Sequence, residues 1–127
     1  MTVTPIDVFA SALHLRGDGE VRAEQRMFDP ERDGWQLIAS RVETDADVHA
    51  DHWELHPKSD EIVSCLTGGI RLYLRPEQPG EEEEVVALTA GTAVIVPRGR
   101  WHRIELDAPG DIMAVTVPRG SRLEKRA

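Results

Sequence analysis

The sequence has few of the features typical of disulfide-stabilised or membrane-spanning proteins. Cys65 is the single cysteine among 127 residues, so an internal disulfide and a zinc site built from cysteine pairs are both excluded. No run of 18 apolar residues occurs, and the N-terminus has no basic start followed by a long apolar segment, which argues against a membrane helix and a signal peptide. We therefore expect a soluble, cytoplasmic protein with no membrane partner.

Basic residues are also scarce. The chain has 15 Lys and Arg against 23 Asp and Glu, a net charge of -8, and a pI of about 5.1. Such a charge repels a phosphate backbone, so we expect no nucleic-acid partner. A chain of this length fits one domain that buries roughly two-thirds of its unfolded surface. Residues 1–127 are therefore predicted to form a single domain.

Beyond residue 34 the chain is a series of short apolar or alternating segments separated by Gly, Pro and Asp. These segments are "WQLIASRVE", "ADHWELH", "EIVSCLT", "GIRLYLR", "EVVALT", "TAVIVP", "WHRIEL" and "DIMAVTV". Turn signals recur about every 8 to 12 residues, which is typical of an all-β sandwich or barrel. Before residue 34, "IDVFASAL" could form a short helix or an added edge strand, and "VRAEQRMF" resembles a strand. We expect "RGSRLEKRA" at the C-terminus to be a frayed tail.

Four polar residues interrupt this pattern of strands and turns. Glu54 and His56 are two residues apart, so on a strand both side chains point to the same face. Glu61 follows after a break containing Pro57, and His102 follows the turn "PRGRW". In an antiparallel barrel these four side chains could converge on one interior point. Two imidazoles and a carboxylate are a common ligand set for divalent metals, with Glu54 as a fourth ligand.

The same residues resemble the two sequence motifs of the cupin superfamily. In the first motif a His-x-His pair is followed by Glu and then Gly; here Glu54 takes the place of the first His, and His56, Glu61 and Gly68 match. In the second motif, Gly91, Pro97, Gly99 and His102 match, while Leu106 replaces the closing Asn. The resemblance covers roughly residues 35–118.

This resemblance implies an all-β, cupin-type jelly-roll β-barrel with a short N-terminal extension. It also implies metal ligation by Glu54, His56, Glu61 and His102. Two carboxylates and two neutral imidazoles balance the charge of a +2 ion, which suits Mn, Fe, Ni or Zn without sharp discrimination. Small cupins are commonly dimers, so the resemblance implies a homodimer that takes a small-molecule ligand.

Three further residues are expected to line the same cavity. His52 shares strand parity with Glu54 and His56, although an exposed position is an equal alternative. Cys65 shares parity with Glu61, and inert packing is its alternative role. Arg100 flanks His102 and could meet an anionic substrate, or it could be a solvated loop arginine.

The sequence leaves three functions open, so the catalytic residues stay unknown. The first is a metal-dependent enzyme of dioxygenase, isomerase or lyase type acting on a small polar molecule. The second is a non-catalytic module that senses a small molecule or a metal. The third is a metal-free epimerase or isomerase with His56 and Glu61 as acid and base.

Overall fold

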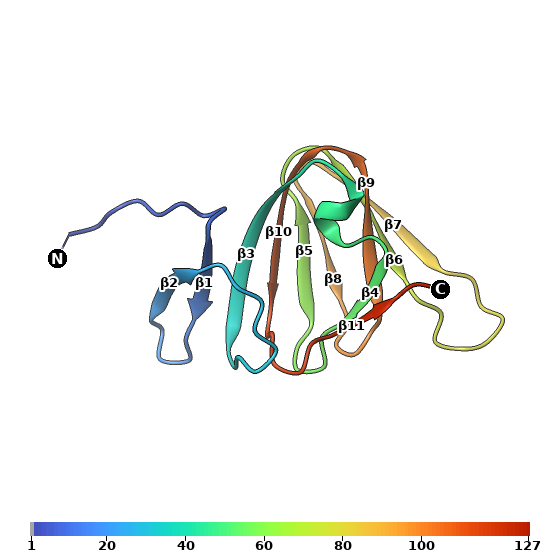
Figure 1. Ribbon diagram of the computed structural model, residues 1–127, viewed down its shortest axis with the longest axis horizontal. Helices are drawn as coiled ribbons and strands as arrows, with labels where there is room; N and C mark the ends of the chain where they lie inside the picture. The colour runs from blue at the N-terminus through green and yellow to red at the C-terminus, as the bar shows by residue number, and fades with distance from the viewer. Residues whose placement is uncertain (1) are drawn as a thin grey trace.

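The computed structural model describes residues 2–127, and almost all regular structure in it is β-strand (Figure 1). One short 3-10 helix, η1 (Asp45–Val48), interrupts the strands. The strands are β1 (Ser11–Leu15), β2 (Val21–Gln25), β3 (Trp35–Val42), β4 (His52–Leu55), β5 (Glu61–Cys65), β6 (Gly69–Leu74), β7 (Glu84–Thr89), β8 (Thr92–Val96), β9 (His102–Ala108), β10 (Gly110–Thr116) and β11 (Arg122–Lys125). No helix among the described residues is long and apolar enough to cross a membrane.

The strands form two antiparallel sheets that face each other across the core. One sheet has the order β2-β1-β3-β10-β5-β8 and the other β11-β4-β9-β6-β7. Successive strands often lie in different sheets, as β3 and β4 do and β4 and β5 do, which is the arrangement of a jelly roll. The predicted all-β jelly-roll barrel is therefore confirmed.

The N-terminal extension is a β-hairpin added to the edge of the larger sheet. β1 pairs with β2 and with β3, where Leu13 lies opposite Leu37. Of the two alternatives for "IDVFASAL", the edge strand is the one observed. Residues 2–8 run away from the barrel as an extended segment (Figure 1).

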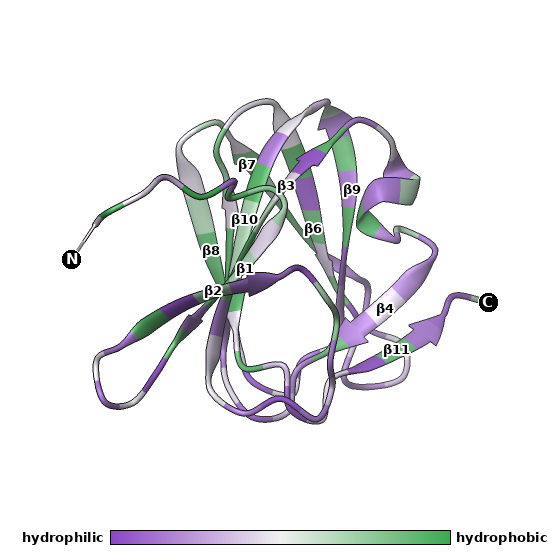
Figure 2. Cartoon of the chain, turned by 60° about the vertical axis from the view of Figure 1, so that its left-hand side comes forward, coloured by the Kyte–Doolittle hydropathy of each residue, from purple (hydrophilic) through white to green (hydrophobic). Residues whose placement is uncertain are grey.

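The C-terminal segment is ordered, so the expectation of a frayed tail is wrong. β11 pairs with β4 over its whole length, with Leu123 opposite Glu54 and Lys125 opposite His52. All four of its residues are exposed, and Figure 2 shows both β11 and the edge strand β2 as largely hydrophilic. Apolar periodicity is absent from this segment, and its pairing depends on backbone hydrogen bonds that composition does not reveal.

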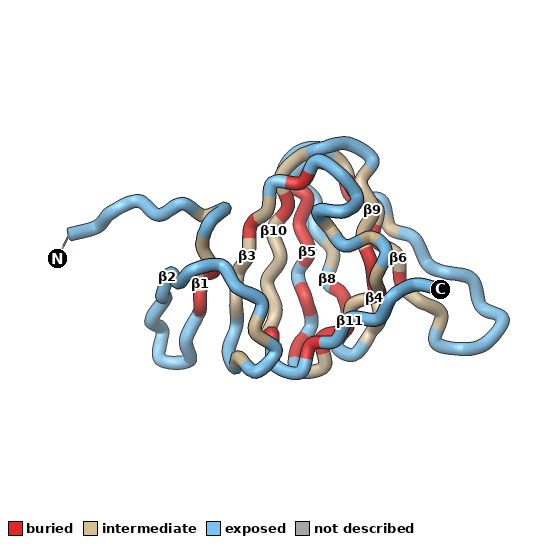
Figure 3. The backbone as a smooth tube through the Cα atoms, in the orientation of Figure 1, coloured by how far each residue is buried: buried red, intermediate tan, exposed pale blue. Residues whose placement is uncertain are grey.

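The barrel interior is apolar at one end and polar at the other. Alternate residues of β5 and β6 fill the apolar part, as the red stretches of β5 in Figure 3 illustrate. The core members are Val42, Val63, Cys65, Ile70, Leu72, Leu74, Leu88, Val96 and Ile112. Buried polar side chains, among them His56, Glu61 and His102, occupy the other end.

Two motif glycines have structural roles that explain their spacing. Gly68 has a φ of 79°, and a Cβ there would collide with the carbonyl oxygen of Pro109. The backbone N–H of Gly99 donates a hydrogen bond of 2.9 Å to the carbonyl oxygen of His56. The turn of the second motif is therefore fixed directly against the first motif.

Candidate metal centre

Three strands bring the four predicted ligands to one place. Glu54 lies on β4, His56 follows that strand, Glu61 begins β5 and His102 begins β9. Glu54 and His102 are direct partners in the β4–β9 pair. Because β5 belongs to the opposite sheet, the four side chains meet between the two sheets at one end of the barrel.

Glu61 contacts both histidines. Its two carboxylate oxygens lie 3.2 Å from Nε2 of His56 and 2.8 Å from Nε2 of His102. Glu54 lies 3.1 Å from the same His56 nitrogen on the other side. One ligand atom each of Glu54, His56 and His102 falls within 4.8 Å of the others. Glu54 is the only one of the four that is substantially exposed, with 39% of its side-chain surface accessible.

The outer nitrogen of each imidazole is held by a hydrogen-bond partner. Nδ1 of His102 donates to the carbonyl oxygen of Arg100 at 3.0 Å. Nδ1 of His56 lies 2.7 Å from the hydroxyl oxygen of Ser121. Partners of this kind fix the ring orientation and leave Nε2 as the ligand atom. Both Nε2 atoms therefore face the centre of the group.

The two Nε2 atoms are better placed to bind a metal ion than to form hydrogen bonds with the neighbouring carboxylates. Both are buried, and neither makes a well-aligned hydrogen bond, although Glu61 is within ion-pair distance. Buried polar atoms are almost always satisfied, so two ring nitrogens that face the same two carboxylates are suited to share a cation. Imidazole and carboxylate together suit a divalent metal ion.

Without an ion, the site would hold protons instead. Burial lowers the pKa of His56, but the carboxylates of Glu54 and Glu61 outweigh it and raise that pKa to about 10. Burial raises the pKa of Glu61, but His102 and His56 outweigh it and lower that pKa to about 2. The pKa of His102 is raised as well, since Glu61 and Glu54 outweigh the effect of its burial. A metal ion must displace these protons, so binding depends on pH.

A cavity of about 260 Å³ opens beside the site. Glu54, His56 and Glu61 form one end of it, while His102 lies behind Glu61 and is fully enclosed. The rest of the lining is contributed by Arg26, Met27, Phe28, Gln36, Ile38, Ser40, Asp47, Val48, His49, Val63, Ile104, Ile112, Met113, Ala114, Thr116, Pro118 and Ser121. A small molecule in this cavity would contact the candidate ligands directly.

The three other residues predicted to line the cavity do not do so. Cys65 faces inward as its parity implied, but it is fully buried in the apolar core. The imidazole of His52 is held by Asp51 at 2.8 Å and borders a separate surface hollow. Arg100 pairs with Glu77 at 2.9 Å on another part of the surface. Strand parity gives the direction of a side chain but not its depth along the barrel.

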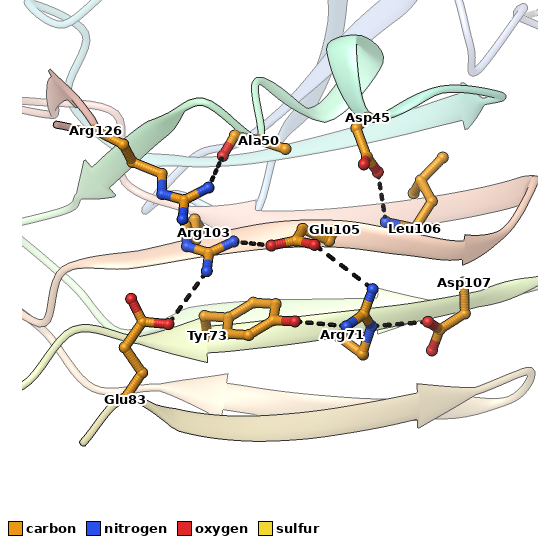
Figure 4. A network of polar contacts seen from close by, with 10 residues as sticks. All are labelled: Asp45, Ala50, Arg71, Tyr73, Glu83, Arg103, Glu105, Leu106, Asp107 and Arg126. Carbon is orange, nitrogen blue, oxygen red and sulfur yellow. Dashed lines mark hydrogen bonds and ion pairs between the residues drawn. The ribbon is translucent and has the colours of Figure 1, made fainter.

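Arg103 follows His102 on β9, and its side chain points to the opposite face of that strand. Its guanidinium lies 3.8 Å from the ring centroid of Tyr73 and pairs with Glu83 and Glu105 on the outer face of the smaller sheet (Figure 4). Arg71, Glu105 and Asp107 continue the network (Figure 4). These charges neutralise one another outside the barrel and take no part in the cavity.

Comparison with known proteins decides the family. The model of the family described as "Cupin domain" matches residues 41–118. The chain belongs to the cupin family. A search of the curated proteins finds no significant match to this cupin.

Solved structures show the same fold at low sequence identity. A cupin-2 domain protein from Shewanella frigidimarina is 19% identical, with a TM-score of 0.50 over 74% of this cupin and 84% of that chain. An oxalate oxidase in complex with glycolate is 15% identical, with a TM-score of 0.52 over 72% of this cupin and 45% of that chain. An oxalate decarboxylase from Bacillus subtilis, described with Mn(II) centres, is 16% identical, with a TM-score of 0.50 over 75% of this cupin and 24% of that chain. This cupin spans less than half of either oxalate enzyme, and the likeness establishes the fold alone.

Two residues at the site were not predicted from the sequence. Ser121 reaches His56 across 65 positions of the chain, and it lies in the segment predicted to be frayed. Arg26 reaches the cavity from the loop after β2. Neither residue belongs to a motif, so only the pairing of the terminal strands could have revealed them.

Proposed function

We propose that this cupin binds one divalent metal ion through Glu54, His56, Glu61 and His102. The observation that carries the proposal is the convergence of two buried Nε2 atoms on the carboxylate of Glu61, with the carboxylate of Glu54 beside one of them. Mn, Fe, Ni and Zn are the candidate ions. A ligand in the cavity would reach the ion on the side of Glu54, whose side chain is partly exposed.

We further propose that the bound ion makes the protein an enzyme for a small polar molecule, of dioxygenase, isomerase or lyase type. A divalent ion in such a site polarises a substrate oxygen or activates water or dioxygen. The protein's own contribution is to orient the substrate in the cavity and to exclude water with the apolar wall of Ile38, Val63 and Ile112. His56 and Glu61 could also hold or release a proton next to the substrate.

Metal analysis tests the first step. Protein purified without chelator is measured for metal content, then titrated with Mn²⁺, Fe²⁺, Ni²⁺ and Zn²⁺ by calorimetry, with Fe²⁺ handled anaerobically. We expect one ion per chain, and a loss of affinity of more than about 100-fold in His102→Ala, since even indirect partners of a metal account for 10–100-fold. His52→Ala is the matched control, because His52 lies outside the cavity. Protein that stays metal-free under all loading conditions overturns the proposal.

A metal-free acid–base enzyme is the second candidate. The contact of His56 with Glu61 at 3.2 Å and their opposite pKa shifts favour it. Turnover of small hydroxy and oxo acids, followed by NMR before and after exhaustive chelation, separates the two candidates. Turnover that survives chelation supports the acid–base enzyme, and turnover that needs added metal supports the metal enzyme.

A further inference from the structure

Arg26 is the one permanently cationic side chain among the residues that line the cavity. Its two neighbours on the N-terminal hairpin are neutralised, since Arg22 pairs with Glu20 and Arg32 with Glu24. Within residues 2–127, every side-chain hydrogen bond of Arg26 goes to a neutral oxygen, namely the carbonyls of Phe9 and Ala39 and the hydroxyl of Ser40. The guanidinium is thus held in place while its charge has no carboxylate partner.

The other charged groups of the cavity do not neutralise Arg26. The carboxylate of Asp47 accepts hydrogen bonds from the backbone N–H groups of Glu43 and Thr44 at 2.8 and 3.1 Å. Glu54 and Glu61 contact the histidines at the far end. An anionic group of a ligand would therefore find its strongest partner in Arg26, because a guanidinium binds a carboxylate through two parallel hydrogen bonds.

The strand register gives the distance between the two ends. Ser40, which anchors Arg26, lies opposite Ile112, and Ile112 lies opposite Cys65. Glu61 is four residues from Cys65 along β5, about 13 Å at 3.3 Å per residue, and β5 lies two strand spacings, about 10 Å, from β3. Ser40 and Glu61 are therefore roughly 16 Å apart across the sheet. Between the two ends, Ile38, Ala114 and Val63 form one apolar row across three strands. The cavity therefore has a cationic end, an apolar middle and the candidate metal centre.

We infer that this cavity binds a linear organic acid of about six to eight carbons, with one carboxylate on Arg26, its chain against Ile38, Ala114 and Val63, and an oxygen-bearing group at the other end. The length follows from the spacing, because hydrogen bonds and ligand contacts of about 3 Å at each end leave room for a chain of that size. The inference rests on the proposed function in one respect. The carboxylates of Glu54 and Glu61 repel the far oxygen group unless a cation balances them.

Direct binding measurements test this inference without any assay of turnover. Succinate, adipate and suberate are titrated by calorimetry into metal-free and metal-loaded protein, with adipamide as the neutral partner of adipate. We expect adipate to bind at least 10-fold more tightly than adipamide, and more tightly than succinate, in the loaded form. In the metal-free form the preference for adipate over adipamide should be smaller, because Glu54 and Glu61 repel its far carboxylate. Equal binding of adipate and adipamide, or no binding of any acid, overturns the inference.

Substitution assigns the effect to Arg26. We expect Arg26→Gln to remove the preference for adipate over adipamide, and Arg26→Lys to keep part of it. Arg32→Gln is the matched control, since Arg32 supports the same hairpin through Glu24 but does not line the cavity. A loss of structure would weaken the binding of adipate and adipamide alike, so the ratio of the two affinities reports the effect of the charge on Arg26. If the ratio of adipate affinity to adipamide affinity is unchanged in Arg26→Gln, the inference is overturned.

The two proposals fail separately in this design. Metal binding without preference for the acid overturns the assignment of Arg26 and leaves the metal site standing. A preference for adipate that depends on Arg26, in protein that never takes up a metal, supports the acid site and overturns the metal site.

Discussion

The hydroxyl oxygen of Ser121 lies 2.7 Å from Nδ1 of His56, and both residues are buried. Ser121 directly precedes β11, whose pairing with β4 holds it beside the histidine. When the hydroxyl accepts a hydrogen bond from Nδ1–H, the Nε2 lone pair is the one left to bind a metal ion. The orientation of His56 thus depends on a residue that lies 65 positions later in the chain.

Removal of that hydroxyl should weaken metal binding. We expect Ser121→Ala to lower metal affinity by about 10–100-fold, the usual cost of losing an indirect partner of a ligating histidine. Calorimetric titration with Zn²⁺ or Mn²⁺ measures it, with Ser11→Ala on the remote hairpin as the control. An affinity equal to that of the unmodified protein would show that Ser121 does not orient His56.

Glu61 should contribute more to metal affinity than Glu54. Glu61 is 6% exposed and touches both histidines, whereas Glu54 touches one and is partly solvated. We expect Glu61→Gln to reduce metal affinity more than Glu54→Gln. In metal-free protein, both substitutions should lower the pKa of His56, because each removes a negative charge that raises it. NMR titration of the histidine resonances measures the pKa, and a value that stays near 10 in both variants would contradict the assignment.

Stability and metal binding should respond oppositely to alkaline pH. The pKa of His56 is raised from 6.5 to about 10, so its contribution to metal-free stability is complete below pH 6.5 and is lost as the pH rises toward 10. The pKa of Glu61 is lowered from 4.5 to about 2, so its contribution is present above pH 4.5 and is lost as the pH falls toward 2. Metal-free protein should therefore be most stable between pH 4.5 and 6.5.

Metal affinity should increase over the range in which metal-free stability decreases, because His56 must lose its proton to become a ligand. Thermal unfolding with and without Zn²⁺ from pH 6 to 9 compares the stability of the metal-free protein with the stabilisation that the metal adds. A metal-free melting temperature that does not change over this range would contradict the assigned pKa of His56.

Gly68 should tolerate no side chain. Alanine there must adopt a φ of 79° and also displace the carbonyl of Pro109. Gly80 has a similar φ of 87° with open space around it, so Gly80→Ala reports the backbone cost alone, about 1–2 kcal/mol. We expect Gly68→Ala to lower the free energy of unfolding by clearly more than Gly80→Ala in urea denaturation. Equal losses would mean that the contact with Pro109 relaxes freely.

The motif-bearing strands were predictable because each combines a period-2 pattern with a strong turn signal. "GIRLYL" and "TAVIV" coincide with β6 and β8, and the motif spacing places Glu54, His56, Glu61 and His102 together. Of the terminal strands, β2 lies within "VRAEQRMF", which was predicted to be a strand, whereas β11 was missed because it is fully exposed and carries no apolar period. The depth of His52 and Cys65 in the barrel also lay beyond the sequence, because it depends on how the two sheets are staggered.

The link between Ser121 and His56 has a consequence for the order in which the protein is made. His56, Glu61 and the turn that holds His102 are all synthesised before Ser121, which follows His56 by 65 residues. A growing chain that has reached residue 110 contains every candidate ligand but lacks the hydroxyl that selects the tautomer of His56. Any ion bound before Ser121 is in place would meet a histidine without this partner, so we expect full metal affinity only once β11 has paired with β4.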